Sequence, residues 1–111
     1  MTYLELDKRD QTIFALMKTI DFGRLSNFII RDGHAVATRQ SRQVRSRKIG
    51  AEKIKRQAAR PDGNFVLTEK HEEFLDLVRE TSDGVINVIQ IQAGLPVSLE
   101  IEEAVASILP G

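Results

Sequence analysis

The sequence predicts an α+β fold in which two repeated helix-hairpin (α-β-β) units share a four-stranded antiparallel sheet, with both helices on one face. Three observations predict it: an internal repeat, a helix-then-hairpin pattern in each copy, and a basic insert between the copies. The chain has 111 residues, the size of one ordinary domain, and 41% of them are hydrophobic. We therefore expect a single domain over 1–111, with repeat units at about 6–37 and 67–102 and an insert over 38–64.

The repeat has an offset of 61 residues. Its apolar positions pair Leu25 with Ile86, Phe28 with Ile89, Ile30 with Ile91 and Val36 with Val97, and its glycines pair Gly23 with Gly84 and Gly33 with Gly94. Such self-similarity indicates one structural unit used twice. The alternative is that any two helix-hairpin segments resemble each other, and both segments then still form the same kind of unit.

Each unit begins with an expected helix. Asp7 and Thr68 are suitable N-caps, because their side-chain oxygens can accept hydrogen bonds from the free N–H groups of the first turn. Apolar residues at helical spacing follow each cap. They are Ile13, Leu16, Met17 and Ile20 in the first unit, and Phe74, Leu75, Leu77 and Val78 in the second. A glycine then ends each helix or turns the chain into a strand, Gly23 in the first unit and Gly84 in the second.

Each helix is followed by an expected hairpin. A three-residue loop, Gln92-Ala93-Gly94, places Ile89 opposite Val97 and gathers the apolar side chains on one face. The same register in the first unit places Phe28 opposite Val36, although Asp32-Gly33 is also a strong signal for a two-residue turn. Because one hairpin cannot bury its apolar face alone, we expect the two units to share a sheet; a domain-swapped or dimeric arrangement satisfies the same pattern.

The insert explains why the formal net charge is zero. Residues 31–60 carry ten basic and two acidic residues, a local charge of +8, and the rest of the chain carries −8. This stretch is the basic arm, and residues 51–59 within it have the spacing of a short helix. The residues that we expect to bind an anion or a partner are Arg39, Arg42, Arg45, Arg47, Lys48, Lys53, Lys55 and Arg56.

Two partners fit the basic arm. The first is an acidic protein surface, in this chain or in another molecule, because the repeat aligns Arg39 with Glu100 and Arg42 with Glu103. The alternative is the phosphate backbone of a nucleic acid, which arginine forks bind well. No Phe, Tyr or Trp lies between Phe28 and Phe65, so the base-stacking platform of single-strand binders is missing there. We therefore expect a protein partner or self-association, with nucleic acid as the alternative.

The sequence carries no motif of a known active site. It has no cysteine, nucleophile elbow, phosphate-binding glycine loop or metal-ligand cluster. His34 is expected to pack half-buried, and a catalytic role would need a carboxylate partner that the sequence does not identify. The acidic residues Glu69, Glu72, Glu73, Asp76, Glu80 and Asp83 are expected to form a solvated helix face rather than a metal site. We expect a non-enzymatic cytoplasmic protein without catalytic residues, cofactor, metal or membrane segment.

Overall fold

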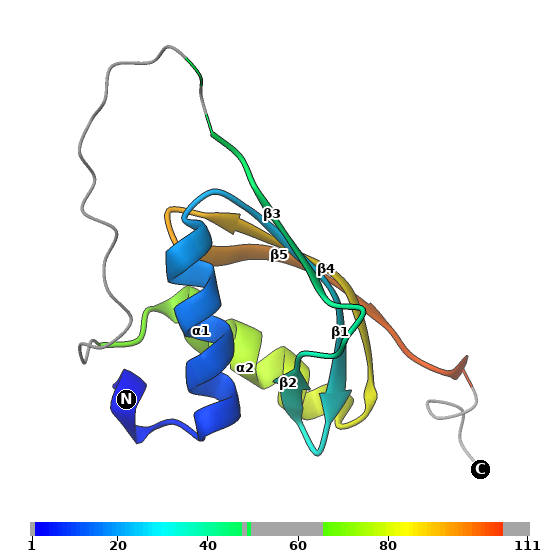
Figure 1. Cartoon of the computed structure of the whole chain (residues 1–111). Helices are drawn as coiled ribbons and strands as arrows, with labels where there is room; N and C mark the ends of the chain where they lie inside the picture. Colours follow the sequence, from blue (N-terminus) through cyan, green and yellow to red (C-terminus); the bar gives the residue numbers. More distant parts are fainter. Residues whose placement is uncertain (1, 48, 50–65, 106–111) are drawn as a thin grey trace.

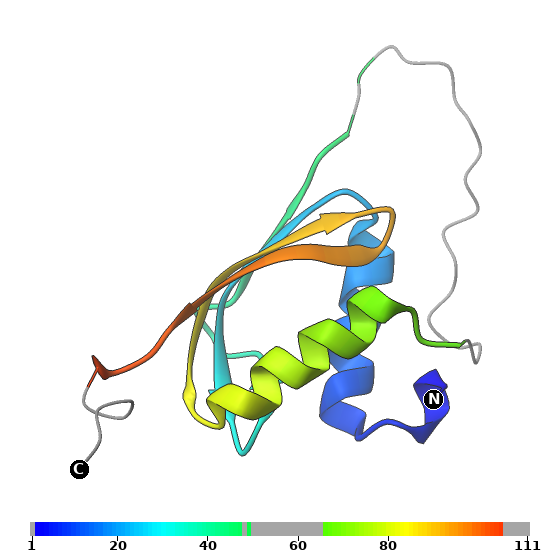
Figure 2. The same cartoon turned by 180° about the vertical axis from the view of Figure 1, so that it is seen from behind.

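Two helices lie on the concave side of a curved antiparallel sheet in the computed structural model, which describes residues 2–47, 49 and 66–105 (Figures 1 and 2). In chain order the elements are the 3-10 turn η1 (Tyr3–Glu5), α1 (Lys8–Ile20), β1 (Gly23–Arg31), β2 (His34–Val36), β3 (Arg42–Arg45), α2 (Glu69–Thr81), β4 (Gly84–Gln92) and β5 (Leu95–Glu102). The predicted α+β class is therefore confirmed.

The sheet has five strands rather than the four predicted. Its order is β2-β1-β4-β5, and β3 also pairs with β1, so β2 and β3 lie one after the other along the same edge. The extra strand comes from the predicted insert. Its four residues are all exposed, which explains why they show no alternation of apolar and polar side chains. The short helix predicted over 51–59 lies outside the described residues.

Both predicted helix caps are confirmed. An Asp7 side-chain oxygen accepts a hydrogen bond from the Arg9 backbone N–H at 2.9 Å, and the Thr68 hydroxyl accepts one from the His71 backbone N–H at 3.5 Å. In α1 the predicted stripe is buried at Ile13, Met17 and Ile20 and partly buried at Leu16. In α2 the prediction is wrong for Leu77, which is 40% exposed. The buried stripe there consists of His71, Phe74, Leu75 and Val78, so Leu77 lies beside it on the helix surface.

Both hairpins turn through two residues, so the three-residue loop predicted at Gln92-Ala93-Gly94 is wrong, and of the two alternatives for the first hairpin the Asp32-Gly33 turn is confirmed. Arg31 faces His34 across the first turn, and Gln92 faces Leu95 across the second. The turn residues Asp32, Gly33, Ala93 and Gly94 all have φ between 52° and 77°. Positive φ at both central positions is the geometry of a type I′ turn, whose twist matches that of the flanking strands.

A β-bulge in β5 keeps the apolar side chains paired although the turn has only two residues. With an unbroken register, a two-residue turn would place Ile89 opposite the polar Ser98. The register instead shifts by one residue between Gln90 and Ile91, where Val97 is the extra residue in β5. Beyond the bulge Ile89 faces Leu99, so the apolar pairing is recovered.

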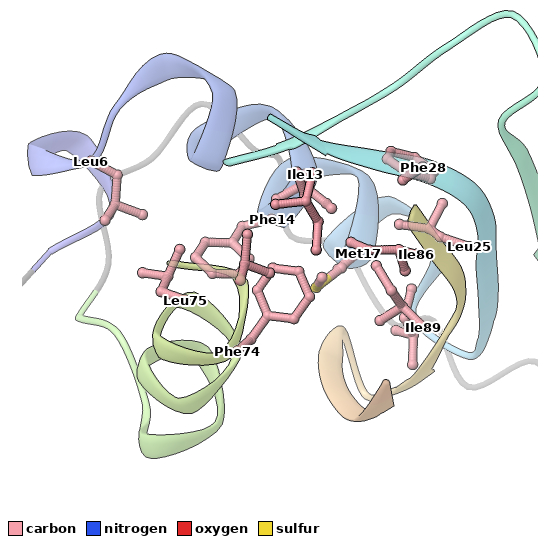
Figure 3. Packing of buried hydrophobic residues seen from close by; sticks show 14 of the residues in the cluster. Leu6, Ile13, Phe14, Met17, Leu25, Phe28, Phe74, Leu75, Ile86 and Ile89 are labelled. Atoms are coloured by element: carbon pink, nitrogen blue, oxygen red, sulfur yellow. The ribbon is translucent and has the colours of Figure 1, made fainter. Parts of the chain in front are cut away.

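The core lies between the helices and the concave face of the sheet (Figure 3). Phe14 from α1 and Phe74 from α2 pack with their ring centroids 5.8 Å apart, and Ile86 and Ile89 of β4 are fully buried. The central strand β1 bends at Asn27, whose φ of 59° interrupts the alternation of its side chains. Figure 2 shows the sheet curving around the helices.

Candidate interaction surface

Four of the predicted basic residues lie together at one sheet edge. Arg42 and Arg45 are the first and last residues of β3, Arg39 lies in the turn before it and Arg47 lies just after it. All four side chains are exposed. We call these four residues the arginine edge (Figure 1, where β3 runs beside β1). The other four, Lys48, Lys53, Lys55 and Arg56, lie outside the described residues.

The arginine edge is held in place by the turn that precedes β3. The Ser41 hydroxyl accepts a hydrogen bond from the Thr38 backbone N–H at 2.8 Å and donates one to the Asn27 carbonyl at 2.8 Å. The Ser41 backbone N–H donates to the Thr38 carbonyl at 3.1 Å. One Arg42 guanidinium nitrogen donates to the carbonyls of Arg39 and Ser41 at 3.2 and 3.1 Å. Side-chain bonds of this type close polar turns, so β3 starts at a defined position beside the bend of β1.

Gly23 allows β3 to approach β1. A Cβ atom at this position would lie 1.9 Å from the Val44 carbonyl oxygen, and the φ of 151° also disfavours a side chain. Gly84, which the predicted repeat aligns with Gly23, has more room, because the nearest atom to its Cβ position is 3.0 Å away. The position of β3, the strand that carries Arg42 and Arg45, therefore depends on Gly23 in the neighbouring strand β1.

The opposite sheet edge is acidic. Glu100 and Glu102 are exposed on β5, and Glu103 follows them. In the sheet register Arg42 faces Ser26, Ser26 faces Val88, and Val88 faces Glu100. Three strand spacings, about 14 Å in total, therefore separate Arg42 from Glu100. The two charged edges belong to one sheet but do not touch.

The ion pairs between described residues lie elsewhere. Arg9 pairs with Asp7 at 3.0 Å, the His34 ring nitrogen Nδ1 lies 3.0 Å from Asp10 Oδ1, and within the described ranges no ion pair involves the arginine edge. The expected pairing of Arg39 with Glu100 and of Arg42 with Glu103 is thus not formed within the described part of the chain. The hydrogen bonds from Arg9 lower the pKa of Asp7 to about 2.

His34 does have a carboxylate partner, Asp10, which the sequence alone does not identify. Its Nδ1 lies 3.0 Å from Asp10 Oδ1, and Asp10 is only 2% exposed. A sequence signal exists, because Asp10 begins the helical stripe that continues through Ile13 and Met17, and a buried acid needs a partner. The pair joins the β1–β2 hairpin to the first turn of α1. We interpret it as a structural tie, since the hollow beside it between α1 and β2 is lined by neither side chain.

His71 occupies the matching position on α2 and is also buried. Its Nδ1 accepts a hydrogen bond from the Thr68 backbone N–H at 3.1 Å, which completes a capping box. Its ring packs edge-on against Phe14, with the centroids 4.6 Å apart. Burial and, to a smaller extent, the positive charge of Lys18 together lower the pKa of His71 to about 4. The imidazole is therefore neutral at neutral pH.

Two grooves lie between a helix and an outer strand. The first, between α1 and β2, is lined by Arg9, Thr12, Ile13, Phe28 and residues 35–37. The second, between α2 and β5, is lined by Lys70, Glu73, Phe74, Leu77 and residues 96–99. The partly exposed side chains of Leu77 and Val97 both line the second groove. Each groove has one basic residue near the start of its helix; the first is mainly apolar, and the second has both polar and apolar lining residues.

The acidic side chains of α2 are all exposed, as expected of a solvated face. Within residues 2–47, 49 and 66–105, no group of three or more His, Asp or Glu side chains is arranged to hold a metal ion. In the same ranges no helix is both long and apolar enough to cross a membrane. No family model matches the sequence, and comparisons with curated proteins and with solved structures also found no match.

Proposed function

We propose that the protein is a non-enzymatic interaction or oligomerisation module whose basic arm, residues 31–60, contacts an acidic surface on another molecule. The observation that carries the proposal is the placement of opposite charges on opposite edges of one sheet. Arg42 and Arg45 lie on the β3 edge, Glu100 and Glu102 lie on the β5 edge, and the strands β1 and β4 separate them. A complementary contact therefore requires a second molecule.

Charge pairing of this kind contributes more to binding specificity than to affinity. An exposed ion pair contributes only about 0–1 kcal/mol, and salt screens it over about 10 Å. The expected complex is therefore weak and sensitive to ionic strength, and backbone or apolar contacts must supply the rest. Opposite charges also speed up the encounter of the two partners.

We further propose that the fold consists of two repeated α-β-β units. The helices support this, because α1 and α2 differ by 61 residues at both ends, as do β1 and β4. The pairing of β1 with β4 is consistent with a two-fold axis, since Gly23 faces Ile91 and the aligned Gly84 faces Ile30. The two grooves add support: Arg9, Ile13 and Val36 align with Lys70, Phe74 and Val97 at the same offset.

The alternative function is nucleic-acid binding through the phosphate backbone. It is favoured by the three exposed arginines at positions 39, 42 and 45, which form no ion pair with the described acidic residues. Guanidinium groups bind phosphate oxygens in pairs, and such binding is steeply salt-dependent. The basic arm contains no Phe, Tyr or Trp, so nucleic-acid bases cannot stack on aromatic side chains there.

A charge-swap experiment tests the first proposal. Sedimentation velocity of the full chain at low and moderate salt is compared for wild type, Arg42→Glu/Arg45→Glu and Glu100→Arg/Glu102→Arg. If copies pair through the two edges, each double variant alone is monomeric and an equimolar mixture associates again. The matched control is Lys8→Glu, which changes an exposed charge on α1 away from both edges. If the wild type is monomeric, pull-down with wild type and with Arg42→Glu/Arg45→Glu is the second measurement.

The outcomes separate the two functions. A monomer at every salt concentration, with no partner whose capture depends on Arg42 and Arg45, would refute the interaction proposal. Titration with duplex and single-stranded DNA and RNA at low salt tests the alternative. Salt-dependent binding that the Arg42→Glu/Arg45→Glu variant loses would favour nucleic acid. Absence of binding at low ionic strength would eliminate it.

A further inference from the structure

The outer edge of β3 has backbone groups directed away from the sheet. Within the described residues, β3 pairs only with β1, in the register that places Arg45 opposite Gly23. Beyond the strand end, the Ser46 N–H donates to the Phe22 carbonyl at 2.8 Å, as at a hydrogen-bonded position of the ladder, while the Phe22 N–H donates to the Ile20 carbonyl. Hydrogen-bonded and non-bonded pairs alternate along an antiparallel ladder. The N–H and C=O groups of Gln43 and Arg45 therefore point outward, while those of Arg42 and Val44 bond to β1.

The side chains along this edge select one kind of added strand. Arg42 and Arg45 repel the same edge of a second copy, which protects the protein against β3–β3 pairing. The same charges attract an acidic strand. Val44 is 37% exposed between them and offers an apolar contact. The turn at Thr38–Ser41 fixes the start of the edge, so little ordering is needed before a partner binds.

We propose that β3 accepts an acidic, extended segment of a partner protein as an additional antiparallel strand. This inference rests on the proposed interaction function and names the partner chemistry and the mode of binding. The added residues would lie opposite Arg45, Val44, Gln43 and Arg42, in that order along the partner. Cross-strand complementarity then predicts the pattern acidic, apolar, polar, acidic.

A second copy of the chain fits this edge less well. Its acidic strand β5 contains Pro96, which lacks an N–H, and the bulge at Val97, and both interrupt a regular edge. Addition of β5 to β3 would also be a heterologous contact that leaves a free edge at each end. Such contacts form open chains or rings rather than closed pairs.

The test uses the full chain, labelled with 15N, and a blocked peptide with the core Glu-Val-Thr-Glu. We expect saturable chemical-shift changes at residues 42–46 of the wild type, and no such changes with a Lys-Val-Thr-Lys peptide. Gln43→Pro removes an outward N–H but no hydrogen bond to β1, and Pro is tolerated on sheet edges. Gln43→Ala is the matched control, because it changes the same side chain and keeps the N–H.

One backbone hydrogen bond is worth about a tenfold change in affinity. Gln43→Pro should therefore weaken the peptide about tenfold, and Gln43→Ala should bind like wild type. N-methylation of the peptide threonine, which removes the N–H that donates to the Gln43 carbonyl, should have a similar effect. The amide signals of Arg24 and Ser26 on β1 show whether β3 remains docked in each variant.

The outcomes distinguish this inference from the proposed function. If Gln43→Pro and the N-methylated peptide bind like the unmodified pair, strand addition is wrong, and the interaction proposal stands as long as Arg42→Glu/Arg45→Glu abolishes binding. If the wild type does not bind the acidic peptide, the inference is also wrong. If the chain associates with itself through this edge and the peptide does not displace it, the occupant is a second copy and our assignment is overturned.

Discussion

The buried imidazole of His71 should make the stability of the fold depend on pH. His71 is neutral in the folded state because burial lowers its pKa from 6.5 to about 4, and its Nδ1 accepts the Thr68 N–H. In the unfolded chain the ring titrates near pH 6.5. Between these two values the unfolded state binds more protons than the folded state. The free energy of unfolding should therefore fall as the pH drops from 6.5 toward 4, and the full contribution should be present above pH 6.5.

The size of the effect follows from the shift. Each pKa unit corresponds to about 1.4 kcal/mol, so the shift of His71 from 6.5 to about 4 is worth about 3 kcal/mol below pH 4. The loss at pH 5 should be about 2 kcal/mol. This is a large part of the stability of a small domain, which is typically about 5–15 kcal/mol.

The assay is urea unfolding of wild type and His71→Gln between pH 7.5 and pH 5. Glutamine at this position of a capping box can still accept the Thr68 N–H, and it does not titrate. The carboxylates titrate in both proteins, so their contribution cancels when the free energy of unfolding of one protein is subtracted from that of the other. We expect the wild type to lose about 2 kcal/mol more than His71→Gln over this range. Parallel pH profiles of the two proteins, or an imidazole NMR signal of His71 that titrates near 6.5, would refute the reasoning.

Three further changes test the packing. Gly23→Ala should release β3 and expose the Val44 amide to hydrogen exchange, because the new Cβ would lie 1.9 Å from a carbonyl oxygen; Gly84→Ala should have a milder effect, and equal effects would contradict this view. His34→Leu leaves the buried Asp10 without its ring partner and should lower the free energy of unfolding by about 1–3 kcal/mol in thermal or urea unfolding. Adding Asp10→Leu should recover part of this loss, whereas additive losses would argue against the pair. Phe14→Ala should cost about 3–5 kcal/mol by urea unfolding, and a cost below about 1 kcal/mol would show that the core can close around the missing ring.

Local signals in the sequence predicted the helices well. Asp7 and Thr68 are both side-chain caps, and most of the predicted apolar stripe of each helix is buried. Caps and helical periodicity depend on residues within one or two turns of each other, so a single sequence contains the information. The exposed Leu77 shows the limit of this rule. Four apolar residues lie within five positions of α2, and the periodicity alone does not tell which three face the sheet.

The pairing of the strands is harder to predict from the sequence than the helices, because strand register depends on residues that are far apart in the chain. The three-residue loop predicted at Gln92-Ala93-Gly94 rests on a regular ladder, whereas the bulge at Val97 brings Ile89 opposite the apolar Leu99 with a two-residue turn. The Asp10–His34 pair joins residues 24 positions apart, and no local rule connects them. β3 is held by Gly23 and by the carbonyl of Asn27, both far from it in the sequence. These contacts become visible only when the chain is folded.

The position of β3 also changes how the neutral net charge is interpreted. A charge of +8 over residues 31–60 and −8 elsewhere would be unremarkable if the two sets neutralised each other within the chain. The sheet instead carries Arg42 and Arg45 on one edge and Glu100 and Glu102 on the other, with β1 and β4 between them. Water and salt weaken charges at such distances, so their separation contributes little to folding. The separation of charge gives the protein a positive sheet edge and a negative sheet edge. Such a charge distribution can attract and orient a second molecule, but it adds little to the stability of the fold.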